Sequence, residues 1–235
     1  MTHLDLDSEL LEFISSGDFK PGDRLPTIAE LKSDEFLGLS VSKIREQLEV
    51  ARTLGLVDVR SKTGMRLREY SFTPAVRLSL FYALAQDLST FEFFGELRKH
   101  LEIAFWNGAC ALLTRDDLDA IERCIQQALH KLNHEWIQIP YQEHRQFHLL
   151  IFRRLENPFV QGLLEAYWDA YEAVEINRYA DYDYLHQVWD YHRRILNEIS
   201  QGDFDAAKLA FIEHTQLLRV RPQARNNGDA HQPDP

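Results

Sequence analysis

The stretch SVSKIREQLEVARTLGLVDVRSKTGMRLR, residues 40–68, decides the fold of the N-terminal part of the chain. Apolar residues recur at helical spacing over 41–54, between a hydroxyl N-cap at Ser40 and a glycine at Gly55. The residues that follow alternate like two strands around a turn, over 56–60, 61–64 and 65–68. The stretch therefore predicts a helix followed by a two-stranded hairpin.

Two further helices are predicted upstream of this stretch. Leucines and isoleucines recur at helical spacing over 4–14, and Pro21 with the glycine after it breaks the pattern. Thr27 is a candidate N-cap for a second helix over 28–32. Three helices followed by a hairpin is the order of a winged helix-turn-helix, which we expect to occupy residues 1–70.

The rest of the chain shows helical patterns and no strand pattern. The predicted helices cover 74–88, 90–113, 115–133, 140–154, 157–178, 182–200 and 203–219. We therefore expect an all-α bundle of about seven helices over residues 74–219. Residues 220–235 hold little apolar content and are expected to form a disordered tail. The predicted fold class is mainly α.

The composition and the first residues of the chain argue against a membrane-spanning or a secreted protein. The 235 residues have the composition of a globular protein, with no membrane-length apolar run and no signal-peptide pattern at the start. Cys110 and Cys124 form no metal or redox motif, which fits a reducing compartment. We therefore expect a cytoplasmic protein without membrane contact.

Charge is distributed unevenly along the chain. The formal net charge is −11, which argues against bulk attraction to nucleic acid. Residues 43–68 nevertheless carry seven basic against three acidic side chains. A local basic stripe on an acidic protein suits a specific DNA reader, although a solvated face used for protein contacts would have the same charges.

Candidate DNA contacts gather at the start of the helix over 41–54 and at the hairpin turn. The residues expected to contact double-stranded DNA are Ser40, Ser42, Lys43, Arg45, Lys62 and Gly64. A recognition helix normally brings its N-terminal end into the major groove. Arg45 is placed there for a bidentate contact with guanine, and Lys43 for a phosphate.

Four histidines stand out in the second half of the chain: His144, His148, His192 and His214. His144 and His148 are four residues apart, so both imidazoles project from one face of a helix. Neutral imidazole is the commonest protein metal ligand, and several from separate helices can hold a divalent ion in a bundle. A single histidine of this kind is more often a surface or core polar residue.

The order of these motifs resembles the GntR family of transcriptional regulators, in its FadR-like branch with an FCD effector-binding domain. The N-terminal resemblance is carried by Lys20-Pro-Gly-Asp-Arg-Leu-Pro26, Leu37-Gly-Leu-Ser40, Ile44-Arg-Glu-Gln-Leu48, Leu54-Gly-Leu-Val57 and Gly64. The C-terminal resemblance is carried by Leu97-Arg-Lys-His-Leu-Glu102, Phe147-His148, Glu156-Asn157, His192-Arg-Arg-Ile-Leu196, Gly202-Asp203, Ala207 and His214.

The resemblance implies a role for the helical domain. The four histidines match the family's metal ligands, and Arg98 matches an arginine that helps to hold acidic effectors. We therefore expect a bound divalent metal and a small carboxylate effector. Because the set contains only histidines, Zn²⁺ or Ni²⁺ suits it better than Mg²⁺ or Ca²⁺. Two alternatives stay open: Arg98 pairs with Glu102 on the surface, or His144 points to solvent.

Three positions depart from the family pattern. Ala29 and Val41 stand where the family usually has arginines that touch DNA, and His144 stands where it usually has an aspartate ligand. These departures leave the operator sequence open.

The combined hypothesis is a dimeric transcriptional regulator, a repressor that binds a two-fold symmetric operator and responds to a metabolite, and not an enzyme. One alternative is a metalloenzyme in which Glu143 is the nearest candidate base. Another is a winged-helix protein whose bundle only dimerises.

Overall fold

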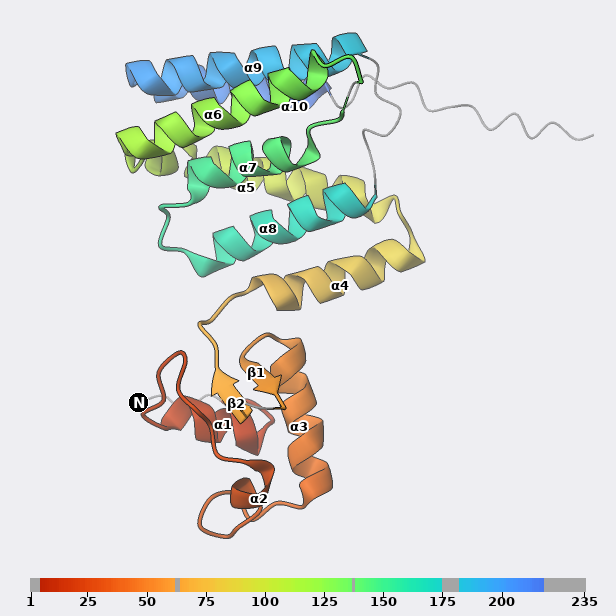
Figure 1. Cartoon of the computed structure of the whole chain (residues 1–235), viewed down its shortest axis with the longest axis vertical. Helices are drawn as coiled ribbons and strands as arrows, with labels where there is room; N and C mark the ends of the chain where they lie inside the picture. The colour runs from red at the N-terminus through yellow and green to blue at the C-terminus, as the bar shows by residue number, and fades with distance from the viewer. Residues whose placement is uncertain (1–4, 62–63, 137, 175–181, 218–235) are drawn as a thin grey trace, which may run out of the picture.

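The computed structural model describes residues 5–61, 64–136, 138–174 and 182–217 (Figure 1). Within these residues the protein is mainly α, with a winged helix-turn-helix followed by an all-α bundle, as the sequence predicts. The wing residue Lys62 and the predicted tail at 220–235 lie outside the described residues.

The described part of the winged helix-turn-helix has three helices and one hairpin. Its elements are α1 (Glu9–Ser16), α2 (Ile28–Leu31), α3 (Val41–Thr53), β1 (Val57–Arg60) and β2 (Gly64–Leu67). The strands are antiparallel, with Val57 opposite Leu67 and Arg60 opposite Gly64. Leu10, Leu31 and Ile44 lie in a common core that holds the helices against the hairpin.

Local capping explains where these helices begin. The Thr27 side chain and Glu30 form a capping box at the start of α2. The Ser40 hydroxyl accepts a hydrogen bond from the Lys43 backbone N–H at the start of α3. Gly55 follows α3 with a φ of 73°, a left-handed conformation that favours glycine. These caps agree with the predicted ones.

The first helix begins later than its apolar spacing predicts. The expected helix covered residues 4–14, but α1 begins at Glu9. Ser8 is its N-cap and accepts a hydrogen bond from the Leu11 N–H, while Asp7 has a φ of 52°. The cap satisfies the first free backbone donors, and the Asp7 conformation prevents the helix from extending backwards.

Within the described residues the bundle contains the seven predicted helices. The predicted ends at residues 178 and 219 lie outside those residues, and the other ends lie within two residues of the predicted ones. They are α4 (Thr73–Gln86), α5 (Thr90–Ala111), α6 (Arg115–Leu132), α7 (Tyr141–Phe152), α8 (Pro158–Ala173), α9 (Tyr182–Gln201) and α10 (Phe204–Leu217). Helix α9 packs along α10 and α6, and α6 packs along α7. In Figure 1, α4 lies between the winged helix and the other bundle helices.

Helix α8 packs against the segment that connects the winged helix to α4. The Phe159 ring packs against Phe72, with centroids 5.3 Å apart, and Thr73 donates a hydrogen bond to Glu165. A Cβ atom built on Gly162 would lie 2.8 Å from the Phe72 Cβ and from the Thr73 backbone N. The absence of a side chain at Gly162 therefore permits this close approach.

In the part of the chain that the structure describes, no helix is both long and apolar enough to cross a membrane.

Gly162→Ala is expected to destabilise the protein by about 1–3 kcal/mol, because the added methyl group meets backbone atoms that cannot move freely. Gly108→Ala is the matched control, since nothing lies within 4 Å of a Cβ atom at that helical position. The control is expected to gain about 0.5–1 kcal/mol from helix propensity. Urea unfolding measures both, and equal effects of the two substitutions would contradict the close contact.

Candidate metal centre

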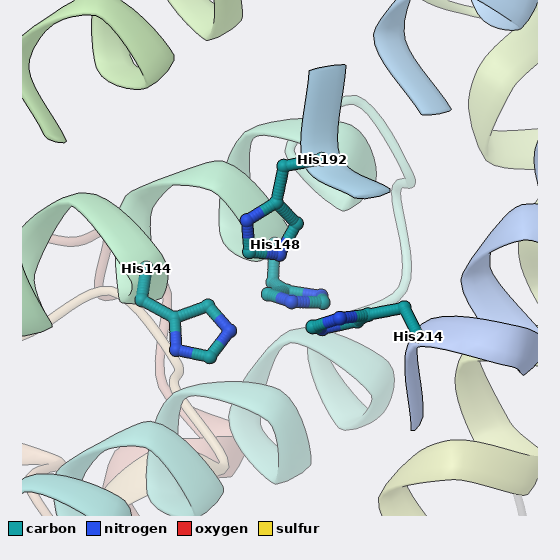
Figure 2. Close-up of side chains that lie close together, drawn as sticks. All are labelled: His144, His148, His192 and His214. Carbon is teal, nitrogen blue, oxygen red and sulfur yellow. The ribbon is translucent and has the colours of Figure 1, made fainter. Parts of the chain in front are cut away.

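The four histidines meet inside the bundle. His144 and His148 lie one turn apart on α7, His192 comes from α9 and His214 from α10. Each imidazole offers one nitrogen, and these nitrogens all lie within 4.8 Å of one another. Figure 2 shows the four rings pointing toward a common centre. All four residues are buried, so the alternative in which His144 points to solvent is wrong.

The amphipathic pattern of the helices places these histidines inside. On α9, His192 belongs to the buried stripe that also contains Val188, Trp189 and Ile195. This spacing of three and four residues is the pattern of a helix face turned to the core. On α7, Phe147 lies on the same buried side as the two histidines. The cluster therefore sits in the helix faces that pack together.

A buried ion pair adjoins the cluster. The Arg98 Nε atom lies 2.6 Å from Glu102 Oε2, and both side chains are almost fully buried. Arg98 Nη2 lies 2.9 Å from His148 Nδ1, and Glu102 Oε1 lies 3.3 Å from the same nitrogen. Arg98 and Glu102 form the ion pair that one alternative predicted. That alternative is wrong about the location, because the pair is buried and not on the surface. The packing of α5 against α10, α8 and α7 turns this face of α5 inward.

Aromatic rings from α8 enclose the ion pair and two of the histidines. The Arg98 guanidinium carbon lies 4.8 Å from the Tyr167 ring centroid and 5.1 Å from that of Trp168. The Trp168 ring lies 4.7 Å from His144 and 4.8 Å from His148, between centroids. These rings exclude water, which strengthens the interactions of the guanidinium with its neighbours.

Burial keeps the imidazoles neutral. It lowers the pKa of His214 to about 3, with the Arg98 charge as a second cause. Burial also lowers the pKa of His144, His148 and His192 well below the usual value. A neutral imidazole has a free lone pair, so the rings are in the form that binds a metal.

Burial also raises the pKa of the Glu102 carboxyl to about 7, although Arg98 beside it acts in the opposite direction.

Several of the imidazole nitrogens have no hydrogen-bond partner within the described residues. They are His144 Nε2, His192 Nδ1, His192 Nε2 and His214 Nδ1. A buried polar group without a partner costs about 1–3 kcal/mol. A cation at the centre of the cluster would satisfy such nitrogens, so the donor set fits a metal ion.

Glu143 does not serve the histidine cluster as a base. It lies on α7, and its carboxylate pairs with Lys131 at 2.7 Å. This ion pair occupies the carboxylate, and Glu143 is not among the residues whose ligand atoms gather at the cluster. The metalloenzyme alternative therefore loses the base that the sequence offered it.

The candidate DNA-contacting side chains lie on the winged helix. Ser40, Ser42, Lys43 and Arg45 are all exposed at the N-terminal end of α3. Lys43 forms an ion pair with Glu9 at 2.9 Å. Gly64 opens β2 with a φ of 75°.

Two residues at these sites, Arg24 and Glu102, were not predicted as site residues from the sequence. The backbone of Arg24 forms an isolated antiparallel β-bridge with Arg66 of β2. The Arg24 guanidinium lies 3.5–3.9 Å from a Cβ atom built on Gly64. Arg24 therefore adds a charge to the wing, and only its place in a family motif pointed to it. Glu102 was considered only as a surface partner of Arg98, because spacing along a helix does not reveal burial.

Glu102→Ala is expected to cost about 3–5 kcal/mol in the free energy of unfolding, because it leaves the buried Arg98 guanidinium without its carboxylate. Replacing both residues by leucine is expected to cost less, because no charge is then left uncompensated. Glu46→Ala, at an exposed position of α3, is the control. Urea unfolding measures all three variants. If Glu102→Ala is as stable as the wild type, Glu102 does not stabilise the protein by pairing with Arg98.

Comparison with known proteins places the chain in a family. A model of the FCD domain matches residues 94–217. The Uxu operon transcriptional regulator of Escherichia coli is 26% identical over 216 residues, which cover 90% of this chain and 82% of that protein. The HTH-type transcriptional regulator LutR of Bacillus subtilis is 24% identical over 206 residues, which cover 86% of this chain and 92% of that protein.

The fold is shared with a solved structure, GntR of Streptococcus agalactiae. The TM-score is 0.66 at 21% sequence identity, over 89% of this chain and 95% of that chain.

The matched FCD segment covers more than half of the chain and contains Arg98 and all four histidines. The curated relatives are transcriptional regulators, which confirms the expectation of a regulator rather than an enzyme. The chain therefore belongs to the GntR family of transcriptional regulators, in the branch that carries an FCD effector-binding domain.

Proposed function

We propose that this regulator is a homodimeric repressor that binds a divalent metal at His144, His148, His192 and His214 and a small carboxylate beside it. The observation that carries the proposal is the cluster of four buried, neutral imidazoles, each with a ligand nitrogen within 4.8 Å of the others. Three of them, His144, His192 and His214, have nitrogens without a hydrogen-bond partner within the described residues. Burial of this many polar rings is costly unless a ligand satisfies them.

The chemistry of the donors favours Zn²⁺ or Ni²⁺. Imidazole nitrogen suits these borderline cations, whereas Mg²⁺ and Ca²⁺ prefer oxygen. The bound metal would act as a Lewis acid that takes an oxygen of the effector.

Charge balance supports an anionic effector. Neutral histidines bring no negative charge, and the Glu102 carboxylate already lies against the Arg98 guanidinium. A divalent cation would therefore leave a net positive charge in a buried site, which is unfavourable. A carboxylate bound to the metal and to Arg98 offsets that charge.

The proposal divides the chain into a DNA-binding domain at residues 1–70 and an effector-binding domain at 74–219. On double-stranded DNA, Arg45 would contact a base edge, and Lys43 the backbone. The serines at positions 40 and 42 and the wing residues Lys62 and Gly64 would add backbone contacts. Two such domains in a dimer match the two halves of a symmetric operator.

Helix α8 provides a connection between the two domains. Trp168 contacts His144 and His148 near the C-terminal end of α8, and Phe159 contacts Phe72 near its N-terminal end. A shift of α8 on effector binding would move the segment that carries the DNA-binding domain and so relieve repression. Operator affinity that stays the same with a ligand known to occupy the site would refute this coupling.

The metal content of untagged protein is the first test. Wild-type protein is expected to carry close to one zinc or nickel ion per chain, and His148→Ala/His192→Ala is expected to carry none. His130→Ala/His134→Ala is the matched control, because both residues are exposed and do not belong to the cluster. Absence of metal from wild-type protein, even after soaking in zinc or nickel, would refute the proposed site.

DNA binding is tested with a duplex that wild-type protein selects from a random pool. Arg45→Ala is expected to lose about 1–3 kcal/mol of specific binding, because a bidentate contact to guanine is removed. Arg123→Ala, an exposed arginine on α6 of the bundle, is expected to have no effect. If Arg45→Ala binds the selected duplex as tightly as wild type does, Arg45 does not read a base.

A further inference from the structure

A concentration of negative charge lies beside α3, the helix that carries the candidate DNA contacts. Residues 5–12 contain four acidic side chains and no basic one. Helix α1, which begins within this segment, packs against α3, and the two helices lie side by side in Figure 1. Acidic groups at this place oppose DNA binding, because they repel the phosphates of the backbone.

One of these acids is paired with a proposed DNA contact. The Glu9 Oε1 atom lies 2.9 Å from the Lys43 Nζ atom. The Glu9 side chain is 45% exposed and the Lys43 side chain is 51% exposed, so the pair lies at the surface, where DNA can reach it. The hydrogen bond from Lys43 is the largest cause that lowers the pKa of Glu9 to about 2, so the carboxylate is charged at neutral pH.

A buried side chain fixes Glu9 in this position. Gln47 lies one turn after Lys43 on α3 and is buried. Its amide nitrogen donates a hydrogen bond to Glu9, and its amide oxygen accepts hydrogen bonds from the Leu10 N–H at 2.8 Å and the Ser8 hydroxyl at 3.3 Å. An ion pair between two mobile surface side chains is weak, because both side chains must be ordered to form it. Here Gln47 already orders the carboxylate, so only Lys43 has to be ordered.

We infer that Glu9 restrains Lys43 and thereby limits the part of DNA binding that does not depend on sequence. The inference rests on the proposed contact of Lys43 with the DNA backbone. To bind a phosphate, the Lys43 ammonium group must leave the Glu9 carboxylate. The carboxylate then stays close to the DNA without its cation, because Gln47 holds it there. The phosphate contact has to offset both the broken ion pair and this repulsion.

The restraint acts on every DNA sequence in the same way. Phosphate contacts carry no sequence information, whereas the proposed contact of Arg45 reads a base edge. A weaker attraction to phosphates lowers the affinity for unrelated DNA and leaves base contacts to supply a larger share of the binding free energy. Glu9 therefore sets the overall strength of DNA binding and not the sequence that the protein prefers.

The salt dependence of binding to two duplexes tests the inference on the full-length chain. One duplex is selected by wild-type protein from a random pool, and the other has the same base composition in scrambled order. Glu9→Gln keeps the shape of the side chain and removes its charge. It is expected to bind both duplexes about threefold or more tightly than wild type, by similar factors. The slope of log K against log salt is expected to steepen by about 1–2, since each neutralised phosphate contributes about 0.9.

Two further variants control for net charge and for the route through Lys43. Asp119→Asn is the matched control, because Asp119 pairs with Arg115 on α6 at 3.1 Å and its side chain is 47% exposed, against 45% for Glu9. This variant is expected to bind DNA like the wild type. In a Lys43→Gln background, Glu9→Gln is expected to give a smaller gain than in the wild-type background, because no restrained cation is released. Urea unfolding shows whether each variant is folded under the conditions of the binding measurement.

Several results would overturn the inference, and they differ in what they say of the proposed function. If Lys43→Gln binds both duplexes like the wild type, with the same salt dependence, the proposed backbone contact of Lys43 fails together with the inference. If Lys43→Gln weakens binding while Glu9→Gln leaves it unchanged or weakens it, the inference alone fails. A gain from Glu9→Gln that is equally large in the Lys43→Gln background also overturns it, because Glu9 then acts as a general negative charge and not through Lys43.

Discussion

The removal of four imidazoles and one guanidinium from water is the constraint on which the rest of the bundle depends. Arg98 is buried between the Glu102 carboxylate, the His148 ring and the faces of Tyr167 and Trp168. A buried charge is tolerated only when it is paired and hydrogen-bonded, so α5, α7 and α8 must meet in this one arrangement. The histidines from α9 and α10 complete the same region, and their unpaired nitrogens make it a site for a cation rather than an ordinary core.

Helix α8 belongs to two regions at once. Its C-terminal half supplies aromatic rings to the histidine cluster, and its N-terminal half packs on the segment that leads to the winged helix. Gly162 allows the second contact, because any side chain there would meet the backbone of Thr73. A rigid helix that touches both a ligand site and a connection between domains is a physical route for coupling them. The proposed regulation rests on this geometry.

Much of the fold was predictable because its signals are local. The capping residues Thr27 and Ser40, the glycine after α3 and the helical periodicity of the bundle each act within a few residues of the chain. The late start of α1 was not predicted, because the apolar spacing of residues 4–14 continues past the Ser8 cap. Periodicity describes which residues share a face, and it does not show where backbone conformation ends the helix.

By itself, the sequence determined the order of the helices and the hairpin, the one-turn spacing of His144 and His148, and the basic stripe along α3 and the hairpin. Only the tertiary structure decided that His192 and His214 meet that pair and that Arg98 and Glu102 are buried rather than exposed. Those features depend on contacts between segments far apart in the chain. Such contacts are set by how whole helix faces pack against one another, which no local pattern of residues specifies.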